Sequence, residues 1–464
     1  MNNDNKTTCV NRRDFLKTLG AGATGLALTA LSGCDFTQKQ ERIIPTDKMT
    51  YRTDPKNGNQ LSLLGFGMMR LPRVARRRGE SLPDVNDIDQ EAVNALVDYA
   101  IAHGVNVFDT APMYGKGFSE KATGEALSRH PRDKYFVSTK LSNSRPPNGW
   151  SREESLKMYY KSFEDLQVDY IDYYFLHNVG NMAAFNRRFI DNGMLDFLFK
   201  EKEAGRIRNL GWSFHGEGKF LEYMAENYPW DFTMINLNYL NYSRGNWRAG
   251  GGITELQSQQ MYEILVRQNI PVWIMGPLMG GGLSNVHHKA RELMMQSNPD
   301  VSTASWGFRF AASSPNVVTV LSGMMFMDHL QDNIHTFSPL VPLTESERQI
   351  LLDDVAHIAH EYRNIGCTKC QYCMPCPYGL DIPELFTHYN RCMNEGNYPT
   401  DKQSEDFKRA RRAFLIGMDR NVSPLRQADR CTSCRLCLPC PQFINIPNEL
   451  RRIARFVESL RQEV

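Results

Sequence analysis

The sequence predicts an α/β fold, a (β/α)8 TIM barrel followed by a smaller, mainly helical unit that carries cysteine motifs. Two observations support this prediction. Short apolar runs alternate with amphipathic stretches from residue 61 to residue 337, and eight of the eleven cysteines form two motifs of four near the C-terminus. With 464 residues, the chain is long enough for two or three domains. We predict the barrel over residues 60–345 and the helical unit over residues 346–464.

Eight apolar runs are the predicted barrel strands. They are Leu61–Met68, Val105–Asp109, Tyr135–Lys140, Tyr170–His177, Asn209–Ser213, Thr233–Tyr239, Pro271–Met275 and Val317–Ser322. Helical patterns lie between them, for example at Glu91–His103 and Glu153–Leu166. Strands that alternate with helices indicate βαβ units and a parallel sheet, and eight strands over about 280 residues fit the usual barrel size of about 250. The alternative is an open doubly wound sheet, which would need a glycine-rich phosphate loop where only Gly65-Phe66-Gly67 stands.

The overall composition is that of an ordinary soluble globular protein. Hydrophobic residues make up 41% and charged residues 23% of the chain, and the net charge is only +2. This balance gives no reason to expect a nucleic-acid partner. The basic run Arg76–Arg78 stands among prolines and a glycine, and we interpret it as a solvated loop rather than a partner-binding patch.

The N-terminus has the pattern of an export signal. The pair Arg12-Arg13 precedes an apolar stretch, Leu19–Leu31, whose 13 residues are too few for a membrane span of about 20. The arginine pair resembles a twin-arginine signal. Leu31-Ser32-Gly33-Cys34 resembles a lipobox, which implies a lipid on Cys34 as the one membrane contact. We expect a signal peptide over 1–34, a linker over 35–59 and a location on the periplasmic side. An uncleaved N-terminal anchor is the alternative.

Four polar residues stand at or just after the ends of predicted strands, where barrel enzymes have their active sites. They are Asp109, Tyr114, Lys140 and His177. A tyrosine phenol has a pKa near 10, and a neighbouring ammonium stabilises the phenolate. We expect Asp109 to hold Lys140, and Tyr114 to act as general acid toward a carbonyl or as base toward an alcohol. His177 would orient the carbonyl or join a proton relay. Each residue alone has a structural explanation, but four at strand ends favour an active site.

These residues also carry a resemblance to a known family. Gly104–Ala111 with Tyr114-Gly115 and Ser119-Glu120 resembles the aldo-keto reductases, and the likeness extends over residues 60–340. It continues through Tyr170–His177, Gly205–Arg208, Ile270–Met275 and Gly281–Leu283. The resemblance implies a (β/α)8 barrel and a catalytic tetrad of Asp109, Tyr114, Lys140 and His177. It also implies reversible hydride transfer between a nicotinamide cofactor, NAD(P), and a small carbonyl or alcohol substrate.

The resemblance further implies a set of cofactor contacts. These are Ser213, Asn236, Tyr239, Ser322, Gly323 and Asn333. Two positions depart from the family pattern, because Ser213 is followed by Phe214 instead of Asn, and Asn236 stands where Gln is expected. No Lys or Arg between Ser322 and Asn333 could pair with a 2′-phosphate, so the choice between NAD and NADP stays open. Tyr239 would stack on the nicotinamide or belong to the core.

The C-terminal cysteines form an internal repeat. Cys367, Cys370, Cys373 and Cys376 are spaced by two residues and precede Pro377; Cys431, Cys434, Cys437 and Cys440 repeat this pattern before Pro441. Three thiolates at this spacing can hold three corners of a cubane, and in two-cluster ferredoxins the fourth cysteine binds the other cluster. We predict two 4Fe–4S clusters. One is bound by Cys367, Cys370, Cys373 and Cys440, the other by Cys431, Cys434, Cys437 and Cys376. Zinc, the alternative, usually takes cysteine pairs separated by a longer loop.

The segment between the two cysteine motifs has helical patterns such as Glu405–Ile416, which resembles helical ferredoxin domains. Cys392 in this segment is expected to be a buried thiol. The chain as a whole resembles fusions of an aldo-keto reductase barrel with a ferredoxin-type unit.

Two functions remain open at this point. The first is an exported iron–sulfur oxidoreductase whose clusters relay electrons, exchanged with a redox partner protein, or brace the fold. The second is an electron-transfer protein whose barrel holds another redox group or no longer catalyses. The difficulty for the first is that clusters pass single electrons whereas nicotinamide transfers a hydride. Binding of NADH or NADPH separates the two functions.

Overall fold

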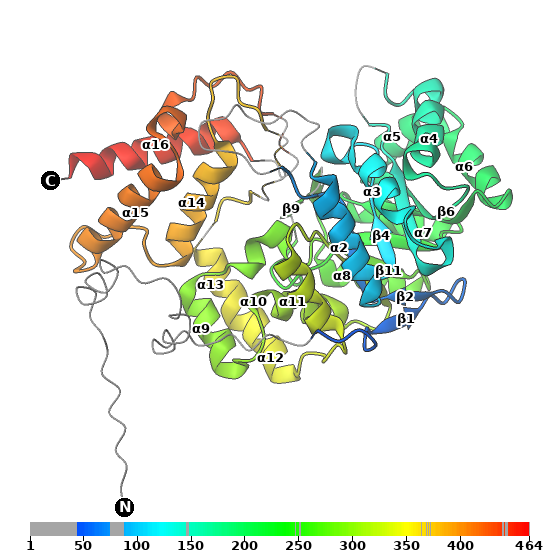
Figure 1. Cartoon of the computed structure of the whole chain (residues 1–464), viewed down its shortest axis with the longest axis horizontal. Helices are drawn as coiled ribbons and strands as arrows, with labels where there is room; N and C mark the ends of the chain where they lie inside the picture. Colours follow the sequence, from blue (N-terminus) through cyan, green and yellow to red (C-terminus); the bar gives the residue numbers. More distant parts are fainter. Residues whose placement is uncertain are drawn as a thin grey trace, which may run out of the picture. The chain divides into compact units, whose positions relative to one another are not determined.

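A computed structural model describes residues 44–74, 88–144, 148–245, 247–249, 252–362, 364–367, 369, 371, 373–438, 440 and 444–463 (Figure 1). The predicted signal peptide with Cys34, the basic run Arg76–Arg78 and Cys370 lie outside the described residues. Within the described part, no helix has both the length and the apolar character needed to cross a bilayer.

Eight parallel strands form a closed barrel, in the order β11-β12-β3-β4-β5-β6-β7-β8. They are β3 (Leu64–Gly67), β4 (Val107–Asp109), β5 (Phe136–Leu141), β6 (Ile171–Val179), β7 (Ile207–Phe214), β8 (Phe232–Asn236), β11 (Val272–Met275) and β12 (Val317–Ser322). Each strand lies within or largely overlaps one of the eight predicted runs, so the predicted barrel is confirmed. The strands are buried on both faces, as parallel strands covered by helices must be, and this is why they stand out as apolar runs.

The first predicted strand, Leu61–Met68, was wrong as a single element. Its first residues form β2 (Gln60–Ser62), which pairs antiparallel with β1 (Tyr51–Thr53), and only β3 enters the barrel. Because residues 61–68 are all buried, the apolar pattern gave no sign of the break. β1 lies inside the segment predicted to be a linker.

The N-terminal hairpin closes one end of the barrel. The Arg52 guanidinium donates to backbone carbonyls of Ala312, Ser314 and Val317, where β12 begins. Tyr173, near the start of β6, donates through its hydroxyl to Asp54 Oδ2 at 3.0 Å. Both contacts lie at the N-terminal ends of strands. The open rim is therefore at the C-terminal ends, where a barrel active site is expected.

Helices and short turns surround the barrel (Figure 1). The main ones are α2 (Gln90–Ala102), α3 (Ser119–Leu127), α4 (Arg152–Leu166), α6 (Met194–Glu203), α7 (Gly218–Asn227), α8 (Ser258–Arg267), α9 (His288–Ser297), α10 (Thr303–Ala312) and α11 (Met327–Phe337). Shorter elements are η1 (Tyr114–Gly117), η2 (Arg132–Lys134), α5 (Met182–Phe185), η3 (Asn186–Ile190), β9 (Trp247–Ala249), β10 (Gly252–Thr254) and η4 (Met279–Ser284). Side-chain caps fix helix starts: Asp89 accepts from Ala92 N, and Ser151 from Glu154 N.

A helical segment follows the barrel. It comprises α12 (Glu345–Gln349), η5 (Ile350–Val355), α13 (Ala356–Glu361), α14 (Ile382–Asn394), α15 (Phe407–Asn421), η6 (Pro424–Arg426), η7 (Ala428–Arg430) and α16 (Ile446–Gln462). α14 and α16 each follow a cysteine motif and begin alike, with a capping Asp381 or Asn445 and then Ile-Pro. α14, α15 and α16 share a core that includes Phe386, Phe414 and Ile453, and six cysteines of the two motifs pack against this core.

Candidate active site

The barrel brings the four predicted active-site residues to one rim. Asp109 is the last residue of β4, Lys140 lies one residue before the end of β5, and His177 lies in the last third of β6. Tyr114 begins η1, the turn that follows β4. β4, β5 and β6 are neighbours in the barrel, so their C-terminal ends lie side by side.

Lys140 is a buried ammonium with two hydrogen-bond acceptors beside it. Its side chain is 1% exposed, and its Nζ donates to Asp109 Oδ1 at 2.5 Å and to the Thr110 carbonyl at 2.7 Å. Ser138 donates to the same Asp109 oxygen at 2.6 Å. Burial lowers the pKa of Lys140, and the Asp109 carboxylate opposes that shift. The Asp109 carboxylate thus favours the protonated form of Lys140, whereas burial alone would favour the neutral amine.

Tyr114 stands between this ammonium and His177. Lys140 Nζ lies 5.2 Å from the centroid of the Tyr114 ring, and the rings of Tyr114 and His177 meet edge to face with centroids 5.7 Å apart. The three residues after Tyr114 all have left-handed backbones, with φ of 55° at Gly115, 59° at Lys116 and 103° at Gly117. Glycine adopts this conformation freely, but lysine does so at a cost of about 1–2 kcal/mol.

His177 is held as a neutral imidazole. Burial, followed by the charges of Lys140 and Arg188, lowers its pKa well below the usual 6.5. Its Nδ1 shares a hydrogen bond of 2.5 Å with Ser142 Oγ. Because Ser142 engages Nδ1, Nε2 is the ring nitrogen that remains to face a substrate.

Arg188 stabilises the C-terminal end of β6, which carries His177. It comes from the π-helical turn η3, is 2% exposed, and donates to the carbonyls of His177 at 2.6 Å and Asn178 at 2.8 Å. Its Nε donates to Asn143 Oδ1 at 3.1 Å. Asn178 has a φ of 54°, where β6 changes register against β7. Burial lowers the pKa of Arg188 to about 9. Arg188 therefore fixes the backbone that carries His177.

Sequence reasoning missed both Ser142 and Arg188. Ser142 lies two residues after Lys140, so the two side chains point to the same face of the extended chain. This spacing is the sequence signal that could have identified Ser142. Arg188 stands in a helical turn eleven residues after His177. Nothing in the sequence distinguishes it from its neighbour Arg187.

Comparison with known proteins identifies the barrel. The profile of the aldo/keto reductase family matches residues 63–351, more than half of the chain. This chain belongs to the aldo/keto reductase family. The match includes all four rim residues and ends before the first cysteine motif. The chain is accordingly an aldo/keto reductase-type oxidoreductase.

Individual relatives agree with this assignment. The chain is 24% identical over 331 residues to L-galactose dehydrogenase of Arabidopsis thaliana, covering 67% of this chain and 97% of that protein. It is 22% identical over 334 residues to Protein tas of Escherichia coli, with coverage of 62% and 93%. Among solved structures, aldo-keto reductase AKR11C1 from Bacillus halodurans (holo form) gives a TM-score of 0.52 at 21% identity, covering 65% of this chain and 95% of that one. An aldo/keto reductase from Klebsiella pneumoniae in complex with NADP and acetate gives 0.50 at 18%, covering 66% and 94%. These likenesses support the fold.

The residues predicted to contact a cofactor lie at other strand ends of this aldo/keto reductase. Ser322 ends β12 and Gly323 follows it, and Asn333 on α11 donates to Ser322 Oγ at 2.9 Å. Ser213 Oγ in β7 accepts a hydrogen bond from the backbone N–H of Asn178 at 2.8 Å. Asn236 ends β8, and its Oδ1 accepts from Asn238 Nδ2 and Asn241 Nδ2 at 3.2 and 3.3 Å.

Tyr239 is packed into the protein. Its ring is 1% exposed and meets Phe310 edge to face at 6.2 Å. Its hydroxyl has no hydrogen-bond partner among the described residues. These surroundings favour a place for Tyr239 in the hydrophobic core over stacking on a nicotinamide.

Arg70 brings a cation to the β12 end of the rim. It follows β3 by three residues, and a Cβ atom placed on Gly323 would lie 3.9 Å from the Arg70 Cβ. Arg70 Nη1 donates to the Gly280 carbonyl at 2.8 Å. Arg70 is far from Ser322 in the sequence, so only the fold brings it near the segment from Ser322 to Asn333.

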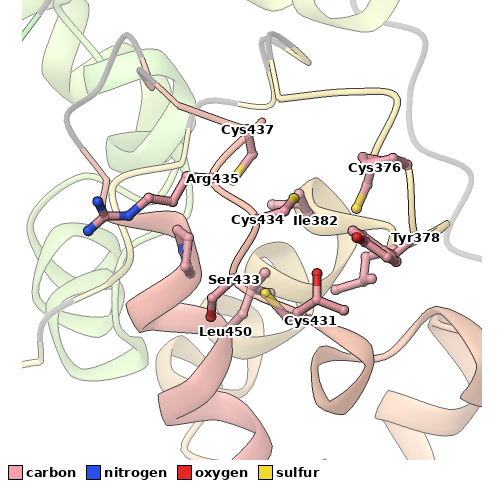
Figure 2. A pocket seen from close by; sticks show the side chains of 13 residues that line it. Cys376, Tyr378, Ile382, Cys431, Ser433, Cys434, Arg435, Cys437 and Leu450 are labelled. Carbon is pink, nitrogen blue, oxygen red and sulfur yellow. The ribbon is translucent and has the colours of Figure 1, made fainter.

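Four cysteines line one pocket in the helical segment. They are Cys376 from the first motif and Cys431, Cys434 and Cys437 from the second. Figure 2 shows their side chains around the pocket, with the Arg435 guanidinium pointing away from it. Burial raises the pKa of the Cys437 thiol, and the neighbouring Cys431, Cys434 and Cys376 raise it further. Within the described residues, no group of three or more His, Cys, Asp or Glu side chains is arranged to hold a metal ion.

The two cysteine loops share an uncommon backbone shape. Lys369 and Gln371 in the first loop have φ of 53° and 61°, and Ser433 and Arg435 in the second have φ of 59° and 66°. These are the second and fourth positions after the first cysteine of each motif. None is glycine, so the same left-handed turns recur in both loops in spite of their cost. Backbones of this kind form concave nests of amide groups, as in many phosphate and Fe–S sites.

Substitution of Ser142 tests the support of His177. We expect Ser142→Ala to reduce kcat about fivefold and leave KM nearly unchanged, because a lost hydrogen bond of about 1 kcal/mol leaves the imidazole less well oriented. Steady-state kinetics of carbonyl reduction provide the measurement. The exposed Ser144 gives a matched control, since Ser144→Ala should leave both constants unchanged. Equal effects of the two substitutions would contradict this role.

Proposed function

We propose that this aldo/keto reductase transfers a hydride reversibly between NAD(P) and a small carbonyl or alcohol, using Asp109, Tyr114, Lys140 and His177. The observation that carries the proposal is the buried Lys140–Asp109 pair beneath the ring of Tyr114. A tyrosine beside a fixed ammonium can lose and regain its proton at neutral pH, and this is the proton exchange that carbonyl reduction requires.

Each residue has a definite task in this proposal. The nicotinamide, when bound, supplies or accepts the hydride. During reduction the Tyr114 hydroxyl gives its proton to the carbonyl oxygen, and the Lys140 ammonium stabilises the phenolate that remains. During oxidation the phenolate takes the alcohol proton. His177 is neutral and offers Nε2 to the substrate oxygen, which orients the carbonyl toward Tyr114.

The rim offers two groups of polar residues to the nicotinamide cofactor. Ser213 in β7 and Asn236 at the end of β8 suit the carboxamide, and the Ser322–Asn333 pair suits the adenosine end. Arg70, whose aliphatic stem lies beside Gly323 and whose guanidinium donates to the Gly280 carbonyl, supports a phosphate contact at that end. The Klebsiella pneumoniae relative in complex with NADP supports the same cofactor class for this chain.

We also propose that the cysteine motifs hold two 4Fe–4S clusters. Support comes from the pocket lined by Cys376, Cys431, Cys434 and Cys437, which is the set expected when the last cysteine of one motif serves the other cluster. The matching left-handed turns of the two loops support the same interpretation. Zinc, with Zn–S bonds of about 2.3 Å, would draw its ligands into a tight tetrahedron, whereas a cubane needs its cysteines farther apart. Six of the motif cysteines pack against the helical core, so the clusters would stabilise this segment whether or not they also transfer electrons.

Replacement of Tyr114 by Phe tests the proposed catalytic role. We expect Tyr114→Phe to lower kcat for NADPH-dependent reduction of benzaldehyde by about 100-fold or more, because the proton donor is gone. The affinity for NADPH should stay within about twofold, since Tyr114 is not a predicted cofactor contact. Fluorescence titration with NADPH and initial-rate kinetics measure the two quantities.

A matched control separates chemistry from folding. Tyr160 is an exposed tyrosine on α4, and Tyr160→Phe should behave as the unsubstituted protein. Failure of the unsubstituted protein to bind either NADH or NADPH would contradict the proposed hydride transfer. It would favour a barrel that holds another redox group.

Metal and sulfide analysis tests the proposed clusters. Anaerobically purified protein should contain about eight irons and eight acid-labile sulfides per chain, and Cys434→Ser should lower both to about four. Cys392→Ala is the control, because Cys392 is buried in the helical core and burial raises its thiol pKa to about 12. Stoichiometric zinc without sulfide would overturn the cluster proposal.

A further inference from the structure

One hydrogen bond joins the catalytic loop to the first cysteine loop. Lys116 lies two residues after Tyr114, and its Nζ donates to the Met374 carbonyl at 2.6 Å. Met374 stands between Cys373 and Cys376 of the first motif. The loop that bears the proposed proton donor is thus in direct contact with a loop that would bind a cluster.

The Lys116 end of this contact is unusual. Lys116 has a left-handed backbone between two left-handed glycines, so the loop makes a sharp turn at a residue that disfavours it. Lysine lacks the short polar side chain with which Asn or Asp stabilises such a turn locally. Its side chain instead extends to Met374, and this contact gives a physical reason for lysine at a position suited to glycine.

The Met374 end is anchored. Its side chain is 8% exposed and belongs to the core shared by α14, α15 and α16. Cys373 and Cys376 on either side pack against the same core. Because only one or two residues separate Met374 from these cysteines, we expect a change in how they are bound to shift the carbonyl that Lys116 contacts.

We propose that Lys116 is a positioning residue that couples occupancy of the first cysteine motif to the placement of Tyr114. The inference rests on the proposed clusters and deepens them. A cluster bound by the first motif, with Cys373 and Cys376 on either side of Met374, fixes the Met374 carbonyl. The carbonyl fixes Lys116, and Lys116 fixes the turn that presents Tyr114. Loss of that cluster releases the turn, so the reductase site works fully only when the cysteine loop is loaded.

Other contacts hold the barrel against the helical segment away from this turn. His287 stacks on Tyr362 with ring centroids 3.8 Å apart, and Asn394 Nδ2 donates to the Asn285 carbonyl. These contacts do not involve Tyr114 or its loop. Removal of the Lys116 ammonium should consequently free the turn without separating the two parts.

The test compares Lys116→Met with the unsubstituted protein, each with its clusters and after anaerobic chelation of iron. Hydrogen exchange of residues 110–118, iron content and kcat with NADPH and benzaldehyde are measured. With clusters present, Lys116→Met should speed exchange and lower kcat by about tenfold each while iron stays constant. Chelation should produce the same changes in the unsubstituted protein. It should add nothing in Lys116→Met, because the coupling is already broken.

Two control substitutions sharpen this test. Lys121→Met removes an exposed lysine of α3 and should change nothing. Lys116→Gly relieves the left-handed turn but also removes the ammonium, so it should lose the coupling as Lys116→Met does. A glycine variant that keeps the normal exchange rate and kcat would show that the contact is dispensable, and it would overturn the inference.

The remaining outcomes are distinguishable. If iron is present and the effects of Lys116→Met and chelation multiply, the clusters stand and the coupling through Lys116 is wrong. If the unsubstituted protein contains no iron, the cluster proposal itself fails and the coupling fails with it.

Discussion

The buried ion pair between Lys140 and Asp109 is the constraint on which the rest of the active site depends. An isolated ammonium that is 1% exposed would shed its proton, because burial penalises the charged form. The Asp109 carboxylate, the Thr110 carbonyl and the Ser138 hydroxyl together provide the environment in which the pair persists. This arrangement needs β4 and β5 to be adjacent and parallel, in the register that sets Asp109 opposite Ser138, two residues before Lys140. The barrel topology thus supplies the ion pair directly. The strands fix the position of the Lys140 ammonium, and this charge lies close to both Tyr114 and His177.

Much of this fold could be predicted from the sequence, because parallel strands buried on both faces appear as uninterrupted apolar runs. Val317–Ser322 coincides with β12 for this reason. The same property caused the error at Leu61–Met68, where a hairpin strand and a barrel strand are both buried and no polar residue marks the break. The role of β1 could not be anticipated either. It depends on the contacts of Arg52 with Val317 and of Asp54 with Tyr173, which join residues more than 100 positions apart in the chain.

The site was predictable where a residue's place on a strand determines its place in space. Asp109, Lys140 and His177 lie at or near strand ends, and neighbouring strand ends meet. Arg188 and Arg70 reach the rim from a helical turn and from a loop, and only tertiary packing reveals them. In the helical segment, Cys376 lines the same pocket as Cys431, Cys434 and Cys437 of the second motif, and the assignment of these four to one cluster stays a prediction. The left-handed turns at Lys369, Gln371, Ser433 and Arg435 carry no signal in residue type, since none is glycine.

The central claim is that the ammonium of Lys140, held by Asp109, makes Tyr114 an effective proton donor. The most direct measurement is the single-turnover rate of hydride transfer from NADPH to benzaldehyde in Lys140→Met, together with NADPH affinity. We expect a rate lower by about 100-fold or more with NADPH binding retained, because the phenolate loses its stabilising charge while the cofactor contacts stay in place. A Lys140→Met protein that is folded, binds NADPH and transfers hydride at the normal rate would contradict it.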